Sequence, residues 1–155
     1  MGIKFVRIDD RLIHGQVVAS WSKSLDINRI WVIDNTTNDD EFLKGVMKLV
    51  APANIELVIT GEDKIEELAN GYDQEKKNTM ILAKYPYVMQ KLFNTGISFK
   101  ELDIGGISAN PKRKNLYRQI SASPEEVETL REIQKSGVNV YFQVTPEDKK
   151  TEFNF

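Results

Sequence analysis

Cysteine is absent from this chain of 155 residues, and His14 is its only histidine. The sequence therefore has no disulfide framework and no thiolate metal site, and it cannot assemble a zinc cluster from several histidines. We expect the protein to use neither a metal ion nor another cofactor, so its chemistry must rest on ordinary side chains and backbone groups.

Long apolar runs and an excess of charge of one sign are also missing. No apolar stretch approaches the roughly 18 to 20 residues needed to cross a bilayer, and the start of the chain lacks a signal-peptide core. The 21 basic and 23 acidic residues nearly balance, to a formal net charge of −2, which gives no basis for nucleic-acid binding. We expect a soluble, intracellular protein that binds no nucleic acid.

The pattern of apolar residues predicts one α/β domain over residues 1–155, a length sufficient for a substantial core. Short runs rich in Val, Ile and Phe alternate with segments whose apolar residues recur at helical spacing. This alternation favours a single-domain, open, mostly parallel twisted sheet with helices on both faces. The expected strands are 3–8, 29–34, 55–60, 79–83, 102–104, 116–120 (a short edge strand) and 138–144, and the expected helices include 16–24, 39–50, 61–69 and 87–94.

A further helix, between Ser123 and Gly137, has the clearest boundary signals in the sequence. Ser123 is a good N-cap, Pro124 suits the first helical position, and Glu126 completes a capping box with Ser123. Gly137 suits the C-terminal cap. After the last expected strand, a final helical turn is expected at 145–150.

His14 lies in the loop between the first expected strand and the first expected helix, which begins with Gly15 and Gln16. In open α/β sheets, ligands bind at such loops, outside the carboxyl ends of the strands. The free backbone N–H groups of the helix and its dipole favour an anion there. Since neutral imidazole is a competent nucleophile near neutral pH, the pattern indicates a histidine that carries a phosphoryl group.

Three charged residues shortly before His14 fit this chemistry. Arg11 can offer paired donors to phosphate oxygens and balance charge during transfer. Asp9 or Asp10 can hold one ring N–H and leave the other nitrogen to attack, and the residues leave open which aspartate and which nitrogen. A simpler interpretation makes His14 a surface or capping residue and pairs Arg11 with one of the aspartates.

Two strand ends offer secondary candidates for the same crevice. Gly105 and Gly106 follow an expected strand, where they either bring backbone N–H groups close to the phosphate or form a tight turn. Asp34 ends the second strand, where it either lines the crevice or, as we favour, caps the next helix.

The remaining candidates concern partners and sugar binding. The basic run at 112–114 is interpreted mainly as a solvated loop, with docking of an acidic partner as the alternative. Trp21 and Trp31 each lie in an apolar periodic segment, so we expect them in the core rather than beneath a sugar ring.

The string from Arg7 to Val17, RIDDRLIHGQV, with Trp21 after it, resembles the active-site loop of the IIB component of the mannose/fructose/sorbose family of the phosphoenolpyruvate-dependent sugar phosphotransferase system (PTS). The resemblance continues through KLVAP at 48–52, through LDIGGI at 102–107 and into the final helix and strand, so it covers essentially the whole chain. The sequence departs from the family at 34–39, where relatives often have a second acidic residue and aliphatic positions, and at Ile107, where many have Met.

The resemblance implies that His14 accepts a phosphoryl group at its ring Nδ1 from a phosphohistidine on the phosphorylated IIA component. It also implies that His14 passes the group to a sugar bound by the membrane IIC and IID proteins, so the chain would be cytoplasmic and peripherally associated with that transporter complex. Arg11 is then expected to neutralise the phosphate, and Asp9 to help order the loop. Selectivity for the sugar would lie largely in the membrane partners.

Two rival functions remain at this point. One is a non-catalytic regulatory module of the same fold, whose histidine phosphorylation signals to a partner without onward transfer to sugar. The other is a small-molecule-binding α/β domain in which His14 is only a polar contact. A transport assay with purified membranes separates the first rival from the phosphocarrier, whereas neither the transported sugar nor the oligomeric state follows from the residues.

Overall fold

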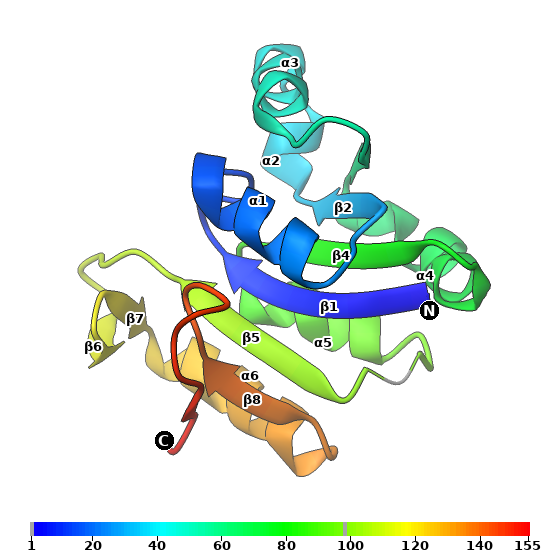
Figure 1. Ribbon diagram of the computed structural model, residues 1–155. Coiled ribbons are helices and arrows are strands. Elements are labelled where there is room, and N and C mark those ends of the chain that lie inside the picture. Colours follow the sequence, from blue (N-terminus) through cyan, green and yellow to red (C-terminus); the bar gives the residue numbers. More distant parts are fainter. Residues whose placement is uncertain (1, 98) are drawn as a thin grey trace.

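A seven-stranded sheet forms the centre of the protein, whose computed structural model describes residues 2–97 and 99–155 (Figure 1). The strand order is β3-β2-β4-β1-β5-β8-β9, and every pair is parallel except β8 with β9. The expected open, mostly parallel sheet is therefore confirmed. Its strands are β1 (Gly2–Asp9), β2 (Arg29–Ile33), β3 (Glu56–Thr60), β4 (Asn78–Ala83), β5 (Glu101–Gly106), β8 (Asn139–Phe142) and β9 (Thr151–Glu152).

Helices cover both faces of the sheet because successive side chains of each strand point to opposite sides. Trp31 and Ile33 belong to an apolar layer shared with α4 (Ile65–Gln74), α5 (Pro86–Phe93) and α6 (Pro124–Lys135). Ile30 and Val32 belong to a second layer, shared with α1 (Gly15–Ser24). Figure 1 shows α1 on one side of the sheet and α5 and α6 on the other.

The helix boundaries follow the capping signals. Ser123 and Glu126 form the predicted capping box of α6. Asp34 accepts a hydrogen bond from the Thr37 backbone N–H, so it caps α2 (Asn35–Asn38), as favoured above. Asp40 does the same for α3 (Glu41–Val50), so the helix expected at 39–50 begins two residues later than expected, and α2 is an additional short helix before it. The helix expected at 61–69 begins instead as a 3-10 turn, η1 (Glu62–Lys64), and continues into α4.

The helix α3 has little contact with the rest of the protein. It carries no buried residue, and Phe42 and Leu49 are 78% and 86% exposed.

No helix within residues 2–97 and 99–155 is both long and apolar enough to span a membrane.

One expectation near the end of the chain is wrong, and a second is confirmed only in part. The strand expected at 116–120 is a hairpin outside the main sheet, β6 (Lys114–Tyr117) with β7 (Ile120–Ala122), because the chain reverses at Arg118, whose φ is +46°. The expected helical turn at 145–150 is a single turn, closed by hydrogen bonds in both directions between Thr145 and Asp148. After it the chain returns to pair with β8, which prevents a helix from continuing.

Candidate functional site

The strand order reverses at β1, and the candidate site lies there. From β1 the chain runs to β2, which lies towards one edge of the sheet. From β5, the neighbour of β1, the next strand of this sheet is β8, which lies towards the opposite edge. Loops that diverge at the carboxyl ends of adjacent parallel strands leave a crevice in which ligands bind. The segments 10–14 and 107–109 border this crevice, and the first of them contains His14.

The loop after β1 is anchored by two apolar side chains. Leu12 and Ile13 are buried in the layer beneath α1, and Leu12 has a φ of +55°. The neighbours of this pair remain accessible: the side chain of Arg11 is 59% exposed and that of His14 is 21% exposed. The buried side chains thus anchor the loop, while its cation and its imidazole remain at the surface.

Asp9, not Asp10, contacts the histidine ring. Nε2 of His14 lies 2.8 Å from Oδ2 of Asp9, and Oδ1 of Asp9 accepts a hydrogen bond from the backbone N–H of Arg11 at 3.0 Å. Asp10 instead accepts a hydrogen bond from the backbone N–H of Ser108 at 2.7 Å. When Nε2 carries the proton and donates to Asp9, Nδ1 is the nitrogen with a free lone pair.

A buried arginine, Arg7, supports this arrangement and was missed by the sequence interpretation. Its Nη2 donates to Asp9 at 3.2 Å and to the backbone oxygen of Val144 at 3.0 Å. Its Nη1 donates to Asp103 and, at 2.8 Å, to the backbone oxygen of Gln143. The only signals in the sequence were Arg7 and Asp103, each a charged residue inside an apolar strand segment. The register of β1 on β5 places these two residues side by side.

Asp103 is the other buried acid of the cluster. Burial raises its pKa to about 7, although the guanidinium of Arg7 acts in the opposite direction. Its Oδ1 atom is buried without a hydrogen-bond partner among the described residues. One buried cation thus stands between two buried carboxyl groups, and the second of them, Asp9, holds the ring of His14.

Gly105 and Gly106 make room for this cluster. They are the last two residues of β5, so they do not form the tight turn considered above. A Cβ atom at Gly105 would lie 2.0 Å from Cζ of Arg7, and one at Gly106 would lie 3.1 Å from Oδ1 of Asp9. Larger residues at these positions would displace the side chains that support His14.

The first turn of α1 offers donors for an anion. His14 is the N-cap residue, and its side chain makes no capping hydrogen bond. Gly15, with a φ of +51°, and Gln16 follow it, and both are exposed. Free N–H groups at a helix N-terminus favour an anion, so the site combines an imidazole, an exposed arginine and backbone donors. Within residues 2–97 and 99–155, no group of three or more His, Asp or Glu side chains is arranged to hold a metal ion.

The other candidates lie elsewhere. Asp34 caps α2 and lies 3.3 Å from Nζ of Lys84. The basic run at 112–114 is not uniformly solvated, because Arg113 donates to both carboxylate oxygens of Glu126 at 2.9 and 3.0 Å. Trp21 and Trp31 are buried, which confirms them as core residues.

Comparison with known proteins identifies the family. Residues 3–154 match the family model described as PTS system sorbose subfamily IIB component. The sorbose-specific EIIB component of Klebsiella pneumoniae is 28% identical over 148 residues, which cover 96% of this chain and 90% of that protein. The fructose-specific EIIB component of Bacillus subtilis is 26% identical, over 99% of this chain and 94% of that protein.

Solved structures agree. The crystal structure of the IIBSor domain of the sorbose permease from Klebsiella pneumoniae superposes with a TM-score of 0.92 at 28% identity, over 98% of this chain and 93% of that one. Since the family model and the superposition each cover almost all of the chain, this protein belongs to the IIB components of the sorbose subfamily of the PTS.

Proposed function

We propose that the protein is a phosphocarrier, in which His14 takes a phosphoryl group from a phosphohistidine on a IIA component and gives it to a sugar at the membrane IIC and IID subunits. It would act in the cytoplasm, in peripheral contact with that transporter. The contact between Nε2 of His14 and Asp9 is the single observation that carries the proposal, because it leaves Nδ1 as the nucleophile.

The two halves of the reaction use the same groups. In the first, the lone pair of Nδ1 attacks phosphorus and the P–N bond of the donor breaks, returning its electron pair to the donor imidazole. In the second, the sugar hydroxyl attacks phosphorus, the bond to Nδ1 breaks with its electron pair returning to Nδ1, and the hydroxyl proton is released to water. Throughout, the Nε2–H group donates to Asp9, so that carboxylate stabilises the positive charge of the phosphorylated ring and holds its orientation.

Arg11 and the first turn of α1 provide charge balance. Phosphoryl transfer depends mainly on positioning and on stabilising the charge of the equatorial oxygens. The exposed guanidinium of Arg11 can reach those oxygens while its backbone N–H stays on Asp9. The N–H groups at the start of α1, with Gly15 and Gln16, supply further donors.

Intact-mass analysis tests the first half of the reaction. The protein is incubated with phosphoenolpyruvate, the general PTS proteins and a IIA component, and its mass is measured under alkaline conditions. Wild type is expected to gain one acid-labile phosphoryl group, and His14→Ala to gain none. Arg11→Ala is expected to accept the group more slowly with an unchanged unfolding midpoint, whereas Lys23→Ala, which removes an exposed cation at the far end of α1, is expected to match wild type.

Acceptance of phosphate by His14→Ala would refute the assignment. The second half of the reaction is tested by adding purified IIC and IID membranes and sugar to the phosphorylated protein. Release of the phosphoryl group to the sugar is expected from a carrier. A phosphorylated His14 that never discharges to sugar would instead support the regulatory module.

A further inference from the structure

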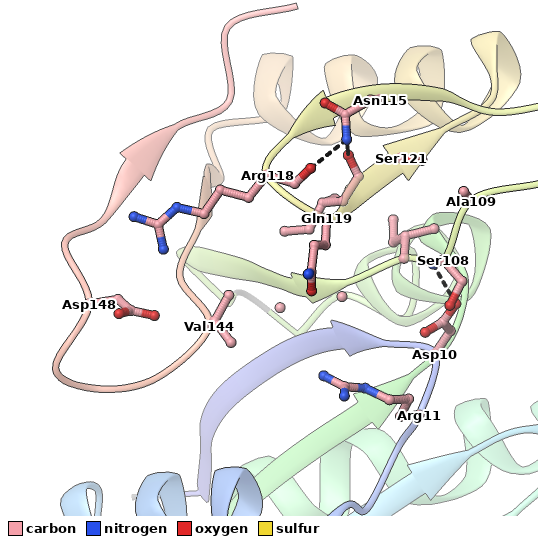
Figure 2. A pocket seen from close by; sticks show the side chains of 14 residues that line it. Asp10, Arg11, Ser108, Ala109, Asn115, Arg118, Gln119, Ser121, Val144 and Asp148 are labelled. Carbon is pink, nitrogen blue, oxygen red and sulfur yellow. Dashed lines mark hydrogen bonds between the residues drawn. The ribbon is translucent and has the colours of Figure 1, made fainter.

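A pocket of about 750 Å³ lies beside the His14 loop, and phosphate binding alone leaves most of its lining unused (Figure 2). One wall consists of Asp10 and Arg11 with the end of β5 and the residues after it. The opposite wall is the β6–β7 hairpin, and the segment around Val144 and Asp148 closes one end. This volume lies within the roughly 300 to 1,000 Å³ typical of small-molecule sites.

The pocket is continuous with the candidate phosphoryl site. Asp10 and Arg11 belong to the loop that carries His14, and Gly106 lies against Asp9, which holds the imidazole ring. In Figure 2, the side chains of Arg11 and Gln119 extend from opposite walls towards the same space. A molecule bound in the pocket therefore lies next to any phosphoryl group that Arg11 holds.

The charges and polar groups of the lining point to a hydroxylated ligand. Arg11 and Arg118 are matched by Asp10 and Asp148, so the pocket as a whole is close to neutral. A site for inorganic phosphate alone would not place two carboxylates on its walls, since they repel the anion. Donors and acceptors side by side instead suit hydroxyl groups, each of which both donates and accepts.

Two other features narrow the ligand class. The polar groups Ser108, Asn115, Gln119 and Ser121 alternate with apolar surface from Ile107, Ile120 and Val144, which suits the two kinds of surface on a sugar ring. Stacking on an aromatic side chain is a common way to bind a nucleobase, but Phe, Tyr and Trp are not among the described lining residues.

We infer that this pocket binds the monosaccharide portion of the phosphoryl acceptor, with the hydroxyl that receives the group directed towards His14. This inference rests on the proposed phosphocarrier function and deepens it, because it places part of the sugar selectivity in this chain. The product, a sugar phosphate, occupies the pocket with its phosphate beside Arg11 and the start of α1.

The transfer step assigns a role to Asp10. The sugar oxygen forms a bond to phosphorus, the bond between phosphorus and Nδ1 breaks, and its electron pair stays on Nδ1. The hydroxyl proton passes to the carboxylate of Asp10 and then to water. The backbone N–H of Ser108 holds Oδ2 of Asp10 at 2.7 Å, which fixes this carboxylate on the pocket wall.

Amide NMR titration of the unphosphorylated full chain tests the inference. The probes are fructose 6-phosphate, mannose 6-phosphate, free fructose and inorganic phosphate. A sugar phosphate is expected to shift the amide signals of Ser108, Gln119 and Ser121, and to bind at least about fivefold more tightly than inorganic phosphate, the worth of about one hydrogen bond. Gln119→Ala is expected to weaken the binding of that sugar phosphate by a similar factor and to leave that of phosphate unchanged.

A control and two outcomes make the test decisive. Lys112→Ala changes an exposed residue outside this pocket and is expected to bind every probe as wild type does. Equal affinity for inorganic phosphate and both sugar phosphates, or no shift in the hairpin signals, would overturn the inference. The phosphocarrier function fails separately, if the intact-mass assay finds no phosphoryl group on His14 of the wild type.

Discussion

Substitution of Asp103 by Asn should change how the stability of the protein depends on pH. Burial raises the pKa of Asp103 from 3.8 to about 7, so the folded state binds a proton that the unfolded chain releases between those values. The resulting stability is fully present below about pH 4 and is lost as the pH rises to about 7. At about 1.4 kcal/mol for each pH unit, the effect sums to about 4 kcal/mol.

Asparagine removes this proton equilibrium while it preserves the shape of the side chain. Its carbonyl oxygen can still accept from Arg7, as Oδ2 of Asp103 does now. The difference in unfolding free energy, wild type minus Asp103→Asn, should therefore fall by about 4 kcal/mol between pH 4 and pH 8.

Urea unfolding at constant ionic strength, monitored by tryptophan fluorescence at one-unit steps of pH, measures this difference. Asp63→Asn, which removes an exposed carboxyl group, is the matched control, and its difference from wild type should stay nearly constant. A difference for Asp103→Asn that varies by less than about 0.5 kcal/mol over the range would refute the argument, because the buried carboxyl would then not titrate between the two values.

Three further substitutions probe the surroundings of the site, each by urea unfolding at pH 7. Arg7→Ala leaves two buried carboxyl groups uncompensated and should cost about 3 to 5 kcal/mol; a loss below about 1 kcal/mol would show that water replaces the guanidinium. Gly105→Ala places a Cβ 2.0 Å from the Arg7 guanidinium and should cost about 1 to 3 kcal/mol; wild-type stability would mean that the guanidinium can move aside freely. Glu126→Ala removes both the reciprocal cap on Ser123 and the partner of Arg113 and should cost about 1 to 2 kcal/mol, and an unchanged unfolding midpoint would contradict this.

The fold was predictable from the sequence wherever local rules act alone. The alternation of strands and helices predicted the parallel sheet, and the sequence from Ser123 to Gly137 predicted α6 with its capping box. The hairpin β6–β7 was less predictable, because a non-glycine residue in the left-handed region, Arg118, makes the reversal. Strands of four and three residues, joined by two, leave too short an apolar pattern to recognise.

The candidate site was predictable only in its loop. His14, Arg11 and Asp9 are close in sequence, so their proximity follows from local geometry. The support from Arg7 and Asp103 depends on the register of two strands that are far apart in the chain, and periodicity carries no information about such a register. For the same reason, the sequence did not show why position 105 is a glycine: a side chain there would collide with the guanidinium of Arg7, and no local turn is involved.

The hydrogen bonds of Arg7 can form only at a defined stage of synthesis of the chain. Two of its four acceptors are backbone oxygens of Gln143 and Val144. The ribosome adds Gln143 136 residues after Arg7, so the guanidinium of a nascent chain lacks these two backbone partners until β8 and the segment after it have emerged. The support that Arg7 gives to the His14 loop is therefore complete only after residues 143 and 144 have emerged from the ribosome.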